Sequence, residues 1–187
     1  MIEPKTKKRY QREKTLVSGW ELTERDRDMI EAVHLYRVLG QDQIQRLFFA
    51  DSASAGAAKT KAQRRLRKLF DHEYLERKFL PVYEGMGRSP TLYVLAKRGA
   101  ELLRVERGYD DLVWYSSSRD LEPQFLQHTM AIADFRIAIT LACKKHGFTL
   151  PLWQDENQIK GDYERVSVRL ASGKSQTVPI VPDSYFV

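Results

Sequence analysis

The chain has 187 residues, and 42% of them are hydrophobic, which is enough to build the core of one medium domain or two small ones. No apolar run approaches the roughly 20 residues that a bilayer crossing needs, and the one cysteine, Cys143, excludes a disulfide framework. We therefore expect a cytoplasmic protein without a membrane partner, in which Cys143 is a buried structural thiol.

The net charge of +6 is unevenly distributed along the chain. Residues 1–109 contain 23 Lys and Arg against 15 Asp and Glu, whereas residues 110–187 contain 8 against 10. The balance is thus +8 in the first part and −2 in the second. Such asymmetry predicts that the first part binds a polyanion.

Residues 1–20 carry six basic residues against two acidic ones and contain few apolar residues before Leu16. This composition is typical of a flexible basic arm. Two interpretations are open for the arm: it lies along phosphates or in a minor groove of DNA, or it is a solubilising tail.

Residues 21–104 have the pattern of a winged helix-turn-helix. Thr23, with Asp26 three residues later, forms an acidic capping box and begins a helix that continues to about Tyr36. We expect Gly40 to end that helix, and residues 41–48 to form a second one. A turn of small residues, DSASAG, then leads into a third helix.

The third helix, residues 57–71 (AAKTKAQRRLRKLFD), is amphipathic. Its inner face holds Ala62, Leu66, Leu69 and Phe70, while six basic residues and one acidic residue give the rest a strong positive charge. Strands are expected at residues 74–80 and 91–95, followed by a helix at 96–104. Three helices followed by two strands are the winged-helix order.

The third helix is therefore the expected recognition helix for double-stranded DNA. Residues near its start usually lie deepest in the major groove, so we expect base contacts from this group: Thr60, Lys61, Gln63 and Arg64. Phosphate contacts are expected from Arg67 and Lys68 on the same helix and from Arg88 in the loop between the two strands. The alternatives are a solvated basic face and an ordinary exposed loop arginine.

Residues 105–123 are polar and irregular, which predicts a linker that Trp114 and Tyr115 anchor on a neighbouring domain. Residues 124–145 form an apolar helix that we expect to be buried on several sides and closed by Gly147. Asp134 and Arg136 interrupt its apolar surface, either as a buried charged pair or as a packing feature. Strands are expected at 148–153, 165–170 and 177–187, with a turn between the last two. The fold class is α+β: a winged helix-turn-helix followed by a partial α/β domain at 124–187.

Several of these passages resemble the replication-relaxation family of plasmids, phages and integrative elements. LTERDRDMIEAVHLYRVLGQDQIQRLFF, QRRLRKLFDHEYLERKF and SPTLYVLAKRGAELL are similar to its winged-helix half. LQHTMAIADFRIAI, Trp153 with Glu156, and VPDSYF resemble its second half. The resemblance implies a DNA-binding accessory factor or regulator in the replication or transfer of a mobile element.

The second half of that family also looks like the opening of a restriction-endonuclease-like fold. Pro182-Asp183 would be its PD motif, and Glu156 a further ligand for Mg²⁺. The acidic residue and lysine of the following strand are absent before Val187, so we interpret Asp183 as a turn or strand-edge aspartate and the domain as a truncated version of that fold. His128 belongs to the family-like motif, and we expect a hydrogen-bonded core histidine.

Other chemistry is not indicated. The chain has no Walker loop, GxGxxG or GxSxG, and its four histidines have no metal-ligand spacing. We therefore expect a sequence-specific double-stranded DNA-binding protein with no catalytic residue, metal or cofactor, acting in plasmid replication, transfer or transcription regulation. Three further possibilities are open: a winged helix that docks replication or transfer proteins, a fragment of a metal-dependent nuclease, and a homodimer formed through the long apolar helix.

Overall fold

The computed structural model describes residues 11–12, 19–80, 89–114, 123–159, 164–180 and 182–187. Its contacts divide the chain into two units, Met1–Asp134 and Phe135–Val187, and each is described below by itself. Helices and small antiparallel sheets occur in both, so the α+β class is confirmed. No helix within these ranges has the length and apolar character needed to cross a membrane.

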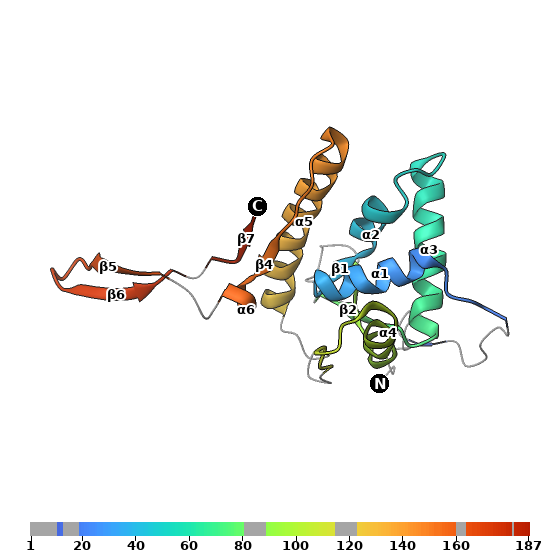
Figure 1. Ribbon diagram of the computed structural model, residues 1–187, viewed down its shortest axis with the longest axis horizontal. Coiled ribbons are helices and arrows are strands. Elements are labelled where there is room, and N and C mark those ends of the chain that lie inside the picture. Colours follow the sequence, from blue (N-terminus) through green and yellow to red (C-terminus); the bar gives the residue numbers. More distant parts are fainter. Residues whose placement is uncertain (1–10, 13–18, 81–88, 115–122, 160–163, 181) are drawn as a thin grey trace, which may run out of the picture. The chain divides into compact units, whose positions relative to one another are not determined.

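The first unit begins with three helices and a three-stranded sheet (Figure 1). Its elements in chain order are α1 (Glu24–Leu35), β1 (Leu39–Gly40), α2 (Gln41–Phe48), α3 (Ala55–Asp71), β2 (Leu75–Phe79), β3 (Thr91–Leu95) and α4 (Lys97–Arg107). The strands are antiparallel in the order β1-β3-β2, with Leu75 opposite Leu95 and Leu39 opposite Tyr93. The predicted succession of three helices and two strands is confirmed, and β1 is an addition.

The predicted capping box of α1 is present. The Thr23 side chain accepts a hydrogen bond from the Asp26 N–H, and the Asp26 carboxylate accepts one from the Thr23 N–H at 2.8 Å. Gly40 was expected to end this helix, and that prediction was wrong. The helix ends at Leu35, Arg37 adopts a left-handed φ of 65°, and the Gly40 N–H donates to Gln43 Oε1 at the start of α2.

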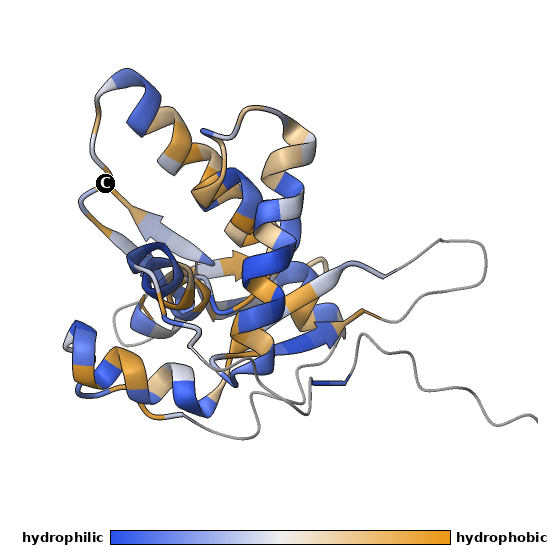
Figure 2. Ribbon diagram, turned by 90° about the vertical axis from the view of Figure 1, so that its right-hand side faces the viewer, coloured by the Kyte–Doolittle hydropathy of each residue, from blue (hydrophilic) through white to orange (hydrophobic). Residues whose placement is uncertain are grey.

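α3 begins two residues before the predicted start because Ser54 caps it, accepting from the Ala57 N–H at 3.2 Å. The expected inner face is confirmed, since Ala62, Leu66, Leu69 and Phe70 are all buried. Figure 2 shows hydrophilic and hydrophobic residues alternating along the helices, as expected for amphipathic helices on a core.

The core of the first unit joins the three helices, the sheet and α4. Its fully buried aliphatic side chains include Met29, Ile30, Val33, Ile44, Leu66, Leu69, Leu75, Leu92 and Leu103. Each such side chain stabilises the unit by about 1.5–3 kcal/mol relative to an exposed position. α4 ends three residues later than predicted because its last turn is tied to α1: Arg107 pairs with Asp28 at 2.8 Å, and Gly108 then ends the helix with a φ of 72°.

Gly99 on α4 packs directly against the chain before β2. A Cβ at this position would collide with the carbonyl oxygen of Tyr74 and lie 2.8 Å from Leu95 Cδ1. We expect Gly99→Ala to lower the free energy of unfolding by about 1–3 kcal/mol, although alanine favours helix. Gly56→Ala is the matched control, because a Cβ there lies 3.9 Å from Ser54 Oγ. Urea unfolding measures the free energy of unfolding of both variants. An equal loss in Gly99→Ala and Gly56→Ala would contradict the tight packing of Gly99 against Tyr74.

α5 (Pro123–His146) spans the boundary between the two units, and Gly147 follows it with a φ of 75°. In the first unit, Leu126 packs in a cluster with Val38, Leu92 and Val94. The helix was expected to be buried on several sides, which was wrong. Its buried positions follow one row, Leu126, Thr129, Ala133 and Ile137, whereas Phe135 is 55% exposed.

Other expectations for α5 also need correction. His128, expected in the core, is exposed, and Cys143 is only half-buried. Asp134 and Arg136 do not form a buried pair, because Asp134 is exposed and pairs with Arg46, while Arg136 lies over the Trp153 ring. His128 and Asp134 are exposed because the row Leu126, Thr129 and Ala133 faces the core of the first unit.

The second unit has two separate two-stranded sheets. β4 (Trp153–Asp155) pairs with β7 (Ser184–Phe186), and β5 (Arg165–Arg169) pairs with β6 (Ser175–Pro179), both antiparallel. A short helix, α6 (Glu156–Ile159), follows β4 and was not predicted. The strand predicted at 148–153 begins only at Trp153, and the run predicted at 177–187 is two strands. Pro151, Pro179 and Pro182 lack the N–H that a longer ladder needs.

The linker predicted at residues 105–123 stays a prediction, because residues 115–122 lie outside the described ranges and the contact boundary falls inside α5. Trp114 is anchored as expected, whereas Tyr115 lies outside the described residues. The Trp114 Nε1 donates to the Leu95 carbonyl oxygen at 3.1 Å, which fixes this part of the chain on the first unit.

Candidate nucleic-acid interface

The first half of α3 presents polar and basic side chains to solvent. Its exposed residues are Lys59, Thr60, Lys61, Gln63 and Arg64. Ala58 and Ala62 between them are buried and hold this part of the helix on the core. Within the described residues, no carboxylate pairs with Lys59, Lys61 or Arg64, so their charges are directed at solvent. The structure therefore brings together the four side chains predicted to read bases.

The predicted phosphate-binding residues Arg67 and Lys68 are only partly available. Both are half-buried. Arg67 Nε lies 2.7 Å from Asp71 Oδ2, and Lys68 Nζ lies 5.9 Å from the centroid of the Trp20 ring. Their phosphate contacts stay a prediction. Arg88, the third predicted phosphate ligand, lies outside the described residues.

Arg65 has a structural role that distinguishes it from its neighbours on α3. Its Nε donates to Asp26 Oδ1 at 2.8 Å, and a second guanidinium nitrogen donates to Asp26 Oδ2. Burial alone would raise the pKa of Asp26, whose side chain is 1% exposed, but the hydrogen bonds from Arg65 and Thr23 outweigh it and lower the pKa below its usual value. Arg65 therefore ties α3 to the first turn of α1.

Two residues of the predicted basic arm are docked on the first unit, which differs from the expectation for them. Arg12 Nε donates to the Phe70 carbonyl oxygen at 2.8 Å, and Arg12 also pairs with Glu76 at 2.9 Å. Trp20 lies against His72, with ring centroids 4.2 Å apart. Residues 1–10 and 13–18 of the arm lie outside the described ranges. The positive charge of Arg12 is thus used inside the protein.

Arg77 on β2 is another basic residue turned inward. Its guanidinium lies 4.3 Å from the centroid of the Phe70 ring and 5.7 Å from that of Tyr93. Burial lowers the pKa of Arg77 and is the main cause of the raised pKa of Tyr93. Strand alternation could have predicted this position, because it places Arg77 on the same face as Leu75 and Phe79.

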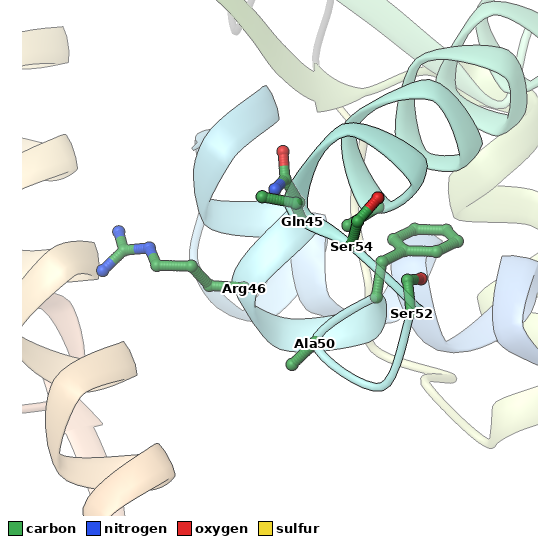
Figure 3. A pocket seen from close by; sticks show the side chains of 8 residues that line it. Gln45, Arg46, Ala50, Ser52 and Ser54 are labelled. Carbon is green, nitrogen blue, oxygen red and sulfur yellow. The ribbon is translucent and has the colours of Figure 1, made fainter.

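A pocket of about 280 Å³ lies where α2 turns into α3 (Figure 3). Its lining is mostly small or polar: Gln45, Arg46, Phe49, Ala50, Ser52, Ser54, Ala55 and Ala58. Figure 3 shows Arg46 extending away from Ser52 and Ser54. The buried Ser52 Oγ has no hydrogen-bond partner among the described residues. This turn therefore has few bulky side chains next to the exposed half of α3.

The residues considered for metal-dependent chemistry lie in the second unit. Asp183 is exposed in a bend before β7, and its carbonyl oxygen accepts from the Glu156 N–H at 3.1 Å. In the described part of the chain, no three His, Cys, Asp or Glu side chains are grouped so that they could hold a metal ion. The position of Asp183 is that of the expected strand-edge aspartate.

The aromatic residues of the second unit form a small cluster that was not predicted from the sequence. Trp153 on β4 stacks on Phe186 on β7, with ring centroids 5.3 Å apart and planes 9° apart. Phe135 meets the edge of Phe186 at 5.9 Å. Trp153 Nε1 donates to Asp155 Oδ1 at 2.9 Å. The Trp153 and SYF motifs therefore pack together to hold the β4–β7 pair on α5.

A family model described as replication-relaxation matches residues 30–187, which include all elements from β1 to β7 and the second half of α1. No curated protein and no solved structure matches the chain.

Proposed function

Because the chain belongs to the replication-relaxation family, we propose that its first unit is a winged helix that binds double-stranded DNA through the exposed half of α3. Family membership indicates a role in the replication or relaxation of mobile elements. DNA binding, transcription regulation and a non-catalytic mode of action are part of the proposal.

This proposal rests on one observation: the basic residues on α3 differ in whether they are paired with a carboxylate. Arg65 is paired with the buried Asp26 carboxylate inside the unit, whereas Lys59, Lys61 and Arg64 have no described acidic partner. A positive surface with no internal counter-charge attracts a polyanion and releases its counterions on binding. The small residues of the α2–α3 turn leave room for a duplex to approach this half of the helix.

In the proposed complex, α3 lies in the major groove with Thr60, Lys61, Gln63 and Arg64 facing base edges. An arginine donates two parallel hydrogen bonds to O6 and N7 of guanine, and a glutamine pairs similarly with adenine. Arg67, Lys68 and Arg88 are the proposed phosphate ligands. The proposed partner is thus B-form DNA, while the homodimer and the replication or transfer proteins stay predictions.

The test is selection of bound sequences from a random duplex library, followed by affinity measurements across a salt series. We expect an enriched sequence and an affinity that falls steeply with salt. Arg64→Ala is expected to lower the affinity for the enriched sequence by about 1–3 kcal/mol and to relax the choice at one base pair. Lys68→Ala is the control, since loss of a phosphate contact weakens all sequences similarly. Equal losses for Arg64→Ala on every sequence would refute its assignment to base reading.

A further inference from the structure

The β5–β6 pair in the second unit is an isolated two-stranded ribbon, here called the ribbon. Figure 1 shows the two strands running side by side. Arg165 is opposite Pro179, Ser167 opposite Thr177, and Arg169 opposite Ser175. Neither strand pairs with another described strand. A two-stranded ribbon is only marginally stable in water, so a ribbon of this length is suited to an element that docks on a partner.

The two faces of the ribbon differ in chemistry. Directly opposed residues of an antiparallel pair lie on the same face, and successive residues along a strand lie on alternate faces. Apart from Pro179, one face of the ribbon therefore carries only arginine, serine and threonine side chains, which can all donate hydrogen bonds. These residues define the polar face: Arg165, Ser167, Arg169, Ser175 and Thr177. All five are exposed. The other face carries Val166, Val168, Gln176 and Val178.

The charge of the ribbon is opposite to that of the rest of its unit. Neither β5 nor β6 contains an acidic residue, and Lys174, which is exposed, precedes β6. By contrast, the rest of the unit, residues 135–164 and 180–187, contains four basic and five acidic residues. Positive charge concentrated on one face of an exposed element favours an anionic partner whose acceptor groups repeat along its length.

The turn at the tip fixes the geometry of the ribbon. The Leu170 N–H donates to the Lys174 carbonyl oxygen at 2.8 Å, and the Gly173 N–H donates to the Leu170 carbonyl oxygen at 2.9 Å. Gly173 has a φ of 81°, which a glycine adopts without strain. This is the three-residue hairpin loop with a left-handed glycine, and it matches the right-handed twist of the strands. Lys174 is thereby placed beside the end of β6 at which Ser175 and Arg169 are opposed.

We propose that the ribbon is a second DNA-binding element, with its polar face directed into the major groove of B-form DNA. That groove is about 12 Å wide and admits a two-stranded β-ribbon. The guanidinium groups would contact phosphates or guanine edges, and the hydroxyls would contact phosphate oxygens. The inference rests on the proposed function, because it assigns a second contact to the same partner. Two elements on one chain raise the affinity for one duplex through effective concentration.

The test uses the full chain with Arg165→Ala combined with Arg169→Ala, and a mixed-sequence duplex titrated at several salt concentrations. Removing two phosphate contacts is expected to reduce the slope of log affinity against log salt by about 1.8. Lys144→Ala with Lys145→Ala is the matched control, since both lysines are exposed in the last turn of α5 in the same unit. The control is expected to keep the wild-type slope. An unchanged slope in the ribbon variant would overturn the proposal.

A duplex RNA of the same sequence is the second arm. The major groove of A-form RNA is too deep and narrow for side chains to read, so the ribbon variant and the wild type are expected to bind RNA equally. An equal reduction on RNA and DNA would overturn the groove assignment.

A comparison with the double variant Lys61→Glu and Arg64→Glu on α3 distinguishes the ribbon inference from the proposed DNA-binding role of α3. If that α3 variant loses binding while the ribbon variant keeps the wild-type slope, the proposed function stands and the ribbon inference fails. If the ribbon variant loses slope while the α3 variant binds as the wild type does, the ribbon inference stands and the proposed role of α3 fails. Both variants are at exposed positions, and circular dichroism checks that they are folded.

Discussion

Arg65→Ala is expected to lower the free energy of unfolding by about 3–5 kcal/mol, because it leaves the buried Asp26 carboxylate without its cation. Asp26 is fully buried, and its two carboxylate oxygens both accept from Arg65. Arg64→Ala, one residue earlier, is expected to change the same quantity by less than about 0.5 kcal/mol, since Arg64 is exposed. Urea unfolding followed by circular dichroism at pH 7 measures both. A similar loss in the two variants would contradict the assignment of Arg65 as the structural tie.

The pH dependence of this difference provides an independent check. The pKa of Asp26 in the folded protein lies below its ordinary value of 3.8. Its ion pair therefore stabilises the fold fully above about pH 3.8, and the stabilisation is lost as the pH falls through the lower, folded-state pKa. We expect the gap in stability between wild type and Arg65→Ala to be large at pH 7 and 5 and to shrink at pH 3. A gap that stays constant down to pH 3 would show that Asp26 is not its source.

The first unit was largely predictable because its signals are local. The capping box of Thr23 and Asp26 is formed by residues three apart, and α2 and β3 have the bounds that their apolar patterns predicted. β1 was missed because a two-residue strand has no periodicity. Gly40 was misinterpreted because glycine after a helix is a common stop signal, whereas the left-handed position here is taken by Arg37.

The candidate site was predictable only where exposure follows from helix periodicity. The outward positions of Lys61 and Arg64 follow from the 100° step per residue. The tie of Arg65 does not, because its partner Asp26 is 39 residues away on another helix. Likewise, Lys68 lies under Trp20, and Arg12 reaches a backbone oxygen 58 residues away. Contacts of this range depend on the tertiary fold, which no local pattern contains.

The second unit was less predictable because its strands are short and interrupted by proline. β4 and β7 have three residues each, and their pairing joins segments about 30 residues apart. The ribbon was the exception, since RVSVRL and the glycine-containing turn after it mark a hairpin locally. The sequence thus indicates hairpins more reliably than pairs of distant strands.

Lys61→Glu combined with Arg64→Glu is expected to reduce the affinity for the enriched duplex by about 100-fold at roughly 100 mM salt. A well-formed arginine contact with a base contributes about 1–3 kcal/mol, and each factor of ten in affinity corresponds to about 1.4 kcal/mol. The two glutamates remove both contacts and add repulsion against phosphates. Both positions are exposed on α3, so the fold is expected to be retained.

The matched control for this variant is Lys97→Glu combined with Arg104→Glu on α4. It makes the same change of net charge at exposed positions in the same unit, away from α3. If binding depends on the α3 surface, the control loses little affinity, whereas the α3 variant loses about 100-fold in affinity. Equal losses in the two variants would mean that DNA responds only to the overall charge of the unit. In that case α3 would be an ordinary solvated basic helix.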